Sequence, residues 1–376
     1  MAYDRALKAL NLEPTDEIPM LGVIGDVEFA EKITGISRRN YREHLPALYR
    51  ALDVDMVYRM GIVSEEVMCR WEEERIDQTI YGSFEDFKDR FPFMDAWHIA
   101  YKGCKLARSP AATYLWVADR PFKTYDELVS HLKRYDPRED EERSVKEIAE
   151  QYRESWRRLQ NLLGDITLVA GEFYLTLLTF FIVRIGWNFM ARLIYKNQDL
   201  FDEVLAKYAE VSKKHMEAWS RTGIKALVSH DDIATELGPM VSPGWYREHL
   251  FPLYKEIWRP IKAKGIKLIF VSDGNYTPLI DDLAWTGVDG FKINPDARIN
   301  HSDLTGLLEK YGGKRIFSLS MRRETMIYGS EEKIISELKF LMSLAKRYNG
   351  VFIHQEDVPA QFEAYYKTWV ENRARI

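Results

Sequence analysis

The amino-acid sequence predicts an α/β protein folded as one (β/α)8 (TIM) barrel. Three observations support this prediction: eight short apolar runs typical of strands, helical patterning between most of them, and 376 residues with 46% hydrophobic content. Such a barrel usually takes about 250 residues plus insertions. The chain is therefore long enough for one barrel, and we treat residues 1–376 as a single domain.

The predicted strands are apolar runs that end at polar or glycine residues. They are Ile18–Gly25, Asp53–Arg59, Ile166–Phe173, Ile224–Ser229, Ile266–Ser272, Asp289–Asn294, Arg315–Ser320 and Val351–His354. Apolar residues at helical spacing separate the later strands, over Pro243–Ala263, Pro278–Thr286, Asp303–Tyr311 and Glu331–Tyr348. Successive strand–helix units require a parallel sheet. A doubly wound open sheet is the alternative, but no Gly-rich phosphate fingerprint follows an early strand.

The residues beyond a minimal barrel lie mostly between the second and third predicted strands. This insertion, residues 60–165, is rich in aromatic and charged residues, which suggests short antiparallel strands and helices over one barrel mouth. We expect it to serve as a lid or as a docking surface for a partner. Its most polar run, Asp136–Ser144, is expected to be the solvated start of a helix.

Composition and charge exclude several classes of protein. The net charge is −5 and the basic residues are scattered, so neither nucleic acid nor an anionic membrane is an expected partner. The apolar stretch Tyr174–Tyr195 contains Arg184 near its middle, so we expect a buried helix rather than a membrane span. With only Cys69 and Cys104, and no visible signal peptide, we expect no disulfide and a reducing, cytoplasmic location.

Polar residues follow the predicted strands, at the end of a barrel where reactive groups normally lie. They are Asp26, Glu65, Glu66, Glu172, Tyr174, His230, Asp231, Asp232, Asp273, Asn275, Asn294, Arg322, Arg323, His354 and Glu356. An Asp or Asn in such a place often caps the next helix, which is our interpretation of Asp281 and Asp303. Glu172 and His230 are poor helix caps, so we expect them to be functional.

A converging set of Glu, His and Asp suits either general acid–base catalysis or a divalent metal. His354 and Glu356 alternate along a strand and would face the same side, either as a ligand pair or as a core histidine beside a rim acid. Arg322 and Arg323 could bind a carboxylate through paired N–H donors or form a surface ion pair. Aromatic residues expected near the mouth could stack on a flat ligand, namely Trp71, Trp97, Tyr174 and Trp187.

Several segments together resemble the uroporphyrinogen decarboxylase superfamily. They are HDDIATELGPMVSPGWYREHLFPLYKEI (His230–Ile257), GIKLIFVSDGNYTPLIDDLAWTGVDGF (Gly265–Phe291), LTGLLEKYGGK and YGSEEKIISEL. The opening RALKALNLEPTDEIPM (Arg5–Met20), followed by AEKITGIS, is similar to the branch that contains corrinoid-dependent methyltransferases. The resemblance covers nearly the whole chain and implies a (β/α)8 barrel.

Two departures from that family's patterns narrow the expected function. The decarboxylase proper carries RQAGRY after its first strand, where this chain has LGVIGDVEFAEK, so counter-charges for a polycarboxylate tetrapyrrole are missing. Thiol-methylating members bind zinc through a His-x-Cys pair and a late Cys. Here that pair is replaced by Val271 and Asp273, and the late Cys falls near Glu356, which argues against zinc–thiolate chemistry.

The resemblance therefore implies a methyltransferase that takes a methyl group from a methoxylated, aromatic substrate to the cobalt(I) of a separate corrinoid (cobalamin) protein. We assign catalytic roles to His230, Asp273, Glu172 and Asp232, and substrate binding to Tyr174, Asn275, Arg322 and Arg323. The ligands of a zinc ion that polarises the leaving oxygen would be Asp273, His354 and Glu356. The insertion would meet the corrinoid protein.

Two alternatives stay open at this point. One is a decarboxylase of a small or tetrapyrrole acid, with Arg322 and Arg323 holding the carboxylate and Asp273 stabilising a protonated intermediate. The other is a barrel without catalytic activity that only binds a corrinoid protein or a ligand. The sequence also leaves the oligomeric state open, a homodimer included.

Overall fold

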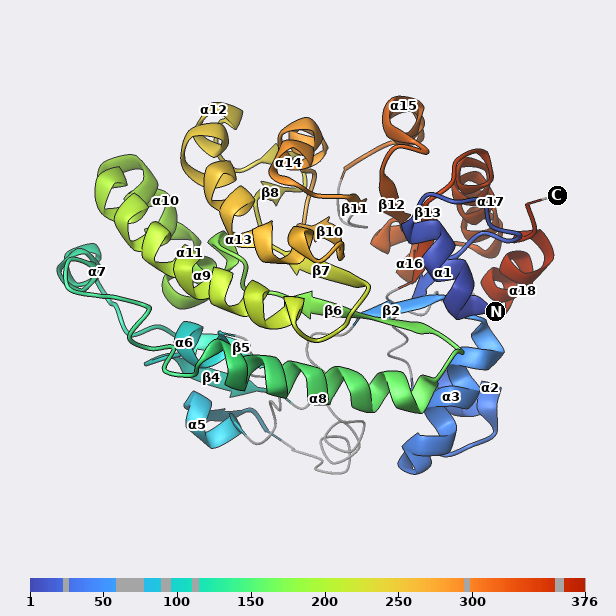
Figure 1. The fold of residues 1–376 in the computed structure, drawn as a ribbon, viewed down its shortest axis with the longest axis horizontal. Coiled ribbons are helices and arrows are strands. Elements are labelled where there is room, and N and C mark those ends of the chain that lie inside the picture. Colours follow the sequence, from blue (N-terminus) through green and yellow to red (C-terminus); the bar gives the residue numbers. More distant parts are fainter. Residues whose placement is uncertain are drawn as a thin grey trace.

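A closed barrel of eight parallel strands forms the centre of the computed structural model, which describes residues 1–22, 27–58, 78–88, 96–109, 115–293, 298–355 and 362–375 (Figure 1). Around the barrel, the strand order is β1-β13-β12-β11-β10-β7-β6-β2. The strands are β1 (Met20–Gly22), β2 (Met56–Tyr58), β6 (Leu168–Phe173), β7 (Ala226–His230), β10 (Lys267–Val271), β11 (Gly290–Lys292), β12 (Ile316–Leu319) and β13 (Val351–Gln355). Each overlaps one predicted strand, so the predicted (β/α)8 barrel is confirmed.

Helices surround the barrel because each crossover between parallel strands must cover the outer face of the sheet. They are α2 (Val27–Thr34), α3 (Tyr41–Leu52), α8 (Val145–Leu163), α9 (Leu178–Ile185), α10 (Trp187–Lys196), α11 (Gln198–Ser220), α12 (Pro243–Trp245), α13 (Phe251–Ala263), α14 (Ile280–Thr286), α15 (His301–Tyr311), α16 (Arg323–Tyr328), α17 (Glu331–Arg347) and α18 (Phe362–Asn372). A π-helical turn, Tyr246–Leu250, joins α12 to α13, so this stretch is one continuous helical run as predicted.

Strand residues alternate between the outer helix layer and the barrel interior. An apolar cluster fills the lower interior and contains Leu21, Met56, Leu168, Ala170, Ala226, Val228, Ile269, Ile316 and Phe352. Because side chains alternate with a period of two, the next inward position on several strands is polar or aromatic. These upper positions are occupied by Tyr58, Glu172, His230, Lys292 and His354, and all five residues are buried. The barrel thus has an apolar floor and a polar upper layer.

The amino end of the barrel is closed by the first helix, α1 (Ala2–Leu10), whose Ala6, Ala9 and Leu10 belong to the interior cluster. Beside it, the fully buried Asp55 accepts a hydrogen bond from Arg5 Nε at 2.6 Å and from Arg373 Nη2 at 3.4 Å. Both arginines are themselves buried. Residues near the two ends of the chain are therefore fixed to the start of β2.

The chain between β2 and β6 contains a small antiparallel sheet with its own apolar cluster. The sheet order is β3 (Ile80–Gly82), β4 (Lys105–Arg108) and β5 (Trp116–Asp119), accompanied by α5 (Phe84–Phe87), α6 (Trp97–Ala100) and α7 (Tyr125–Leu132). Figure 1 shows β4, β5, α5 and α6 at the end of the barrel toward which β6 points, and α6 contacts α9. Trp97 stacks on Tyr174, which directly follows β6, with ring centroids 5.4 Å apart. This part of the chain therefore borders the barrel mouth.

One expectation for this region is wrong. The run Asp136–Ser144 does precede a helix, because Ser144 forms a capping box at the start of α8. It is not fully solvated, however, since Glu141 is buried and accepts hydrogen bonds from Arg143 Nη2 at 2.6 Å and His215 Nε2 at 3.1 Å. The other nitrogen of His215 lies 2.7 Å from the hydroxyl of Tyr152. The acidic run therefore ties α8 and α11 together.

The stretch Tyr174–Tyr195 is two helices rather than the single buried helix expected from its sequence. Helices α9 and α10 meet at 117°, and Gly186 between them has a φ of 81°. Arg120 donates hydrogen bonds to the carbonyls of Ile182 and Val183, which would otherwise lack a partner at the end of α9. Within the described residues, no single helix is long and apolar enough to cross a membrane, whereas this bent pair passes on length and composition alone. Cys104 is buried and free, and Cys69 lies outside the described residues.

Candidate active site

Three polar side chains converge where β7 and β10 end. His230 is the last residue of β7, Asp232 follows two positions later, and Asp273 follows β10. One ligand atom from each residue lies within 4.8 Å of those of the other two. His230 Nε2 is 3.0 Å from Asp232 Oδ1, and the same oxygen accepts the backbone N–H of Asp273 at 3.2 Å. We call His230, Asp232 and Asp273 the mouth cluster.

Buried Asp231 holds the loop that carries the mouth cluster. Its carboxylate accepts backbone N–H groups from Leu177, Leu178 and Thr179, at 3.1, 2.9 and 2.6 Å, and the hydroxyl of Tyr254 at 2.5 Å. These are the otherwise unsatisfied donors at the start of α9, so Asp231 acts as a cap from a distant part of the chain. The chain here alternates its side chains, which leaves His230 and Asp232 together on the opposite side from Asp231.

Electrostatics make His230 and Asp232 an ion pair. Burial alone would lower the pKa of His230, but the Asp232 carboxylate and its hydrogen bond raise it above the ordinary value of 6.5. Burial likewise opposes the ionised form of Asp232, yet His230 holds the pKa of that carboxyl below its usual value. The pair therefore favours the protonated form of the imidazole at the mouth, in which it can act as a general acid.

An aromatic wall stands beside this ion pair. The ring of Tyr174 lies 4.0 Å from that of His230, centroid to centroid, and Trp97 also stacks on Tyr174. Burial raises the pKa of the Tyr174 phenol well above its ordinary value, and the carboxylates of Asp232, Asp273 and Glu172 add to this. Tyr174 is therefore a neutral hydrogen-bonding group and an apolar surface for a flat ligand.

Strands β2, β11 and β13 carry further inward side chains, two of which, Lys292 and Tyr58, were not among the predicted site residues. Lys292, at the end of β11, is only 2% exposed, and its Nζ lies 5.9 Å from the ring centroid of Tyr58. Tyr58 in turn stacks against His354 at 6.0 Å. A sequence signal for Lys292 does exist. Its neighbours Phe291 and Ile293 belong to the outer apolar layer, so period-two alternation directs Lys292 inward.

The remaining predicted residues lie elsewhere or cannot be placed. Asn275 uses its side-chain oxygen for the N–H and hydroxyl of Thr277, where the 3₁₀ turn Thr277–Leu279 begins. Arg322 is exposed, and its Nε lies 3.8 Å from Glu337 on α17, outside the mouth cluster. Arg323 is the first residue of α16 and is partly exposed. Asp26, Glu65, Glu66, Trp71, Asn294 and Glu356 lie outside the described residues.

The two carboxylates that we interpreted as helix caps differ from each other. Asp303 forms a capping box with Asn300 at the start of α15, as expected. Asp281 lies in the first turn of α14, but its carboxylate accepts hydrogen bonds from Lys310 and Tyr311 instead of capping that helix. Neither residue belongs to the mouth cluster.

The mouth cluster fits a divalent metal, because two carboxylates and one imidazole form a hard donor set at short range. This set shares only Asp273 with the predicted ligands. His354 comes from β13, which is separated from β10 by two strands and from β7 by three. Whether His354 and Glu356 take part in metal binding therefore stays a prediction.

Comparison with known proteins relates the chain to others at the level of family and fold. The family model for Uroporphyrinogen decarboxylase (URO-D) matches residues 118–353, which is more than half of the chain. Among solved structures, a methyltransferase from Methanosarcina mazei superposes with a TM-score of 0.61 at 14% sequence identity, covering 99% of this chain and 98% of that one. The sequence has no match among curated proteins.

Proposed function

Because the chain belongs to the uroporphyrinogen decarboxylase (URO-D) family, we propose that it is a corrinoid-dependent methyltransferase of the O-demethylating kind. It would move a methyl group from a methoxylated aromatic substrate to the cobalt(I) of a separate corrinoid protein. The observation that carries this proposal is the mouth cluster, with its ion-paired His230 at the carboxyl end of the barrel. The fold that the chain shares with the Methanosarcina mazei methyltransferase supports it.

Ether cleavage needs a site that can neutralise charge on oxygen. When the O–CH₃ bond breaks, the electron pair stays on oxygen and the methyl group leaves without it, so a phenoxide or alkoxide develops. His230 can donate a proton to that oxygen, while Asp232 orients the imidazole and keeps it protonated. Asp273, the more exposed member of the cluster, would hold or order the substrate oxygen from the adjacent strand end.

A zinc ion would serve the same purpose differently. The mouth cluster supplies three ligand atoms for it, and when bound it would polarise the ether oxygen as a Lewis acid. The nitrogen of an imidazole that binds a metal carries no proton, so the same nitrogen of His230 cannot act as metal ligand and proton donor in the same molecule. Metal analysis of protein purified without chelator therefore distinguishes the two roles of His230.

The walls of the mouth favour a flat substrate. Tyr174 and Trp97 lie next to His230, and the rings of Tyr58 and His354 stack on each other near the ends of β2 and β13. These rings would stabilise an aromatic ring by stacking and exclude water from the reacting oxygen. The insertion borders this opening and is the part that we propose meets the corrinoid protein.

The test mixes the protein with reduced corrinoid protein and a panel of methoxyarenes. We expect the absorbance of the methylated corrinoid together with one equivalent of the matching phenol. A His230→Gln variant should lose this activity, whereas His301→Gln, a change at an exposed histidine on α15, should keep it. No methyl transfer across a broad panel of methyl donors would reject the proposal.

A decarboxylase is the second candidate, and Lys292 is the observation that favours it. Its buried ammonium group could bind a substrate carboxylate inside the barrel, a role first assigned to Arg322 and Arg323. Arg322 is instead directed to Glu337. Carbon dioxide release from a panel of carboxylic acids, abolished by Lys292→Met, would support this candidate over methyl transfer.

A further inference from the structure

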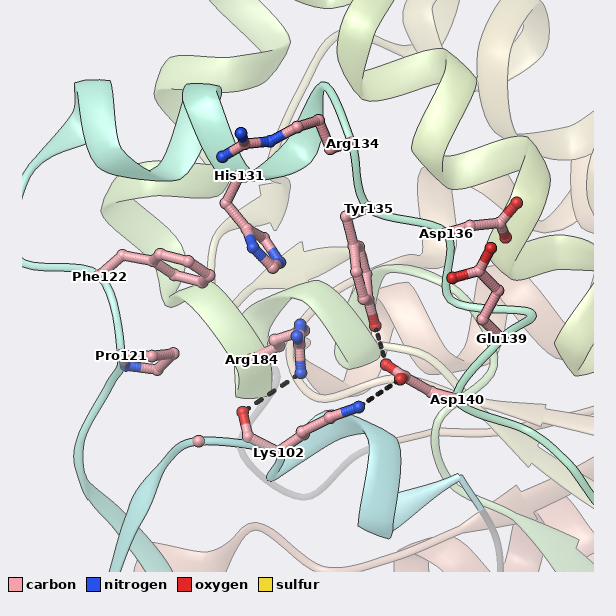
Figure 2. Close-up of a pocket in the computed structure, with 11 residues that line it drawn as sticks. Lys102, Pro121, Phe122, His131, Arg134, Tyr135, Asp136, Glu139, Asp140 and Arg184 are labelled. Atoms are coloured by element: carbon pink, nitrogen blue, oxygen red, sulfur yellow. Dashed lines mark hydrogen bonds and ion pairs between the residues drawn. The ribbon is translucent and has the colours of Figure 1, made fainter.

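A cavity of about 440 Å³ lies away from the barrel interior, between α7, α9 and the turn that follows α6. Figure 2 shows the residues that line it, with the guanidinium of Arg184 between Phe122, His131 and Tyr135. Its volume is within the range of small-molecule sites, which is about 300–1,000 Å³. None of its lining residues belongs to the mouth cluster, so it is a separate candidate site.

A buried cation, Arg184, forms the floor of the cavity. Arg184 is only 4% exposed, and its Nη1 donates to the carbonyls of Ile99 at 2.7 Å and Lys102 at 3.3 Å. No carboxylate in the described part of the chain forms an ion pair with it, and its buried Nε has no hydrogen-bond partner there. A buried guanidinium with donor capacity left over is costly unless an anion binds it.

Aromatic rings form the walls around this cation. His131 lies between Phe122 and Tyr135, with ring centroids 4.9 Å from each, and the guanidinium of Arg184 lies 4.6 Å from the centroid of Tyr135. Burial, together with the nearby Arg184, lowers the pKa of His131, so its ring is neutral. Its buried Nε2 has no hydrogen-bond partner among the described residues. These walls favour a planar ligand with one polar edge.

Charged side chains at the edge of the cavity determine which ligand charge the cavity favours. Asp140 accepts hydrogen bonds from Lys102 Nζ at 2.6 Å and from the Tyr135 hydroxyl at 2.8 Å, so that carboxylate and that lysine neutralise each other. Asp136 binds Arg138, and Glu139 is exposed at the edge. Since Asp140 and Asp136 are paired in this way, the remaining charges of the cavity are Arg184 in the floor and Arg134 and Glu139 at the rim, a balance that suits a monoanion.

We propose that this cavity is a binding site for a small aromatic monocarboxylate, with its carboxylate on Arg184 and its ring among Phe122, His131 and Tyr135. A planar guanidinium matches the two oxygens of a carboxylate. The inference is independent of the proposed function, because it concerns different residues and its test needs neither a methyl donor nor a corrinoid.

The test measures binding of benzoate to the full chain by calorimetry, with benzamide as the neutral isostere. We expect saturable binding of benzoate and at least about tenfold weaker binding of benzamide, since a charge-assisted hydrogen bond is lost. Arg184→Met should weaken benzoate by about tenfold or more. Arg134→Met removes the same charge from the exposed rim of the same cavity and should leave the affinity within about twofold.

Arg184 also donates hydrogen bonds to the backbone carbonyls of Ile99 and Lys102 at the end of α6, so its substitution could disturb the local fold. A second variant, Phe122→Ala, removes a partly exposed wall ring and should weaken benzoate several-fold with an unchanged thermal midpoint. A crystal structure with 4-bromobenzoate should show bromine among Phe122, His131 and Tyr135. Absence of saturable binding, equal affinity for benzamide, or bromine found only in the barrel mouth would each overturn the proposal.

Discussion

Three consecutive residues at the end of β7 serve two purposes, one structural (Asp231) and one proposed to be catalytic (His230 and Asp232). Asp231 is directed toward α9 and satisfies its first backbone donors, while His230 and Asp232 are directed to the mouth and pair with each other. Asp231 thereby fixes the positions of His230 and Asp232. A substitution at Asp231 would displace both residues, so a loss of activity in such a variant would not show that Asp231 takes part in the reaction.

Asp273 is the residue on which the mouth cluster can be tested most cleanly, because it is exposed and not part of a strand. We expect Asp273→Ala to reduce turnover by about 100- to 1,000-fold, as for loss of a transition-state contact, with a nearly unchanged thermal midpoint. Asp281→Ala, at another exposed aspartate, should change neither quantity. An unchanged rate in Asp273→Ala would remove this residue from the site.

Among helices and strands, the sequence pattern predicts the element best where both of its faces are buried. The eight barrel strands could be predicted because strands buried on both faces are continuous apolar runs. Apolar residues continue on both sides of Gly186, so the pattern predicts one helix and conceals the break between α9 and α10. Burial differs across the break, because Met190 and Leu193 are the buried residues of α10. Period-two alternation with Phe291 and Ile293 does indicate the inward direction of Lys292, although a lysine in a three-residue strand is usually a rim residue.

Gly186 provides a prediction about that break. Its φ of 81° and ψ of 159° lie in a region that only glycine adopts readily, and a Cβ there would meet the guanidinium of Arg120 at 3.3 Å. We expect Gly186→Ala to lower the free energy of unfolding by about 1–3 kcal/mol, measured in urea. Gly244→Ala, in a helix with open space around the glycine, should not destabilise. Equal stability of both variants would contradict this account of the bend.

The buried His215 between α8 and α11 predicts a pH dependence of stability. Burial lowers its pKa from 6.5 to about 4, so the folded protein keeps it neutral while the unfolded chain takes up a proton below pH 6.5. Stability should therefore fall as pH decreases from 6.5 towards 4, by up to about 1.4 kcal/mol per pH unit from this group.

The measurement is urea unfolding of the wild type and of His215→Gln across that range of pH. The difference between the two proteins should be largest above pH 6.5 and shrink as the pH falls. His301→Gln, on the surface of α15, should follow the wild-type profile. Parallel profiles for the wild type and His215→Gln would contradict the assignment of a neutral, buried His215.

At the scale of the whole molecule, the barrel topology brings distant residues together, and the sequence predicts this only in part. His230 and Asp273 follow neighbouring strands, so their approach follows from strand order once the barrel is assumed. Hydrogen bonds between side chains of distant segments cannot be found this way. Glu141 and His215 are 74 residues apart, and nothing in either segment indicates its partner. Catalytic and metal-binding roles remain predictions that the experiments above test.

The Arg5–Asp55–Arg373 contact should support the whole barrel. Arg5 pairs with Asp55 at 2.6 Å, with Asp53 at 2.7 Å and with Glu17 at 2.8 Å. Removing one partner of a buried ion pair leaves uncompensated charge, so we expect Arg5→Met to cost about 3–5 kcal/mol of unfolding free energy. Arg50→Met, on the exposed side of α3, should cost little. A small loss in Arg5→Met would show that this contact does not support the barrel.

The same contact has a practical consequence for handling the protein. Backbone hydrogen bonds from Ile18 to Arg373 and from Arg375 to Asp16 bring both described ends of the polypeptide to the face opposite the opening (Figure 1). Tethering through either end to a sensor chip would leave the opening directed to solution. Reordering the polypeptide by joining those ends with a short linker should likewise leave the opening accessible to a large protein.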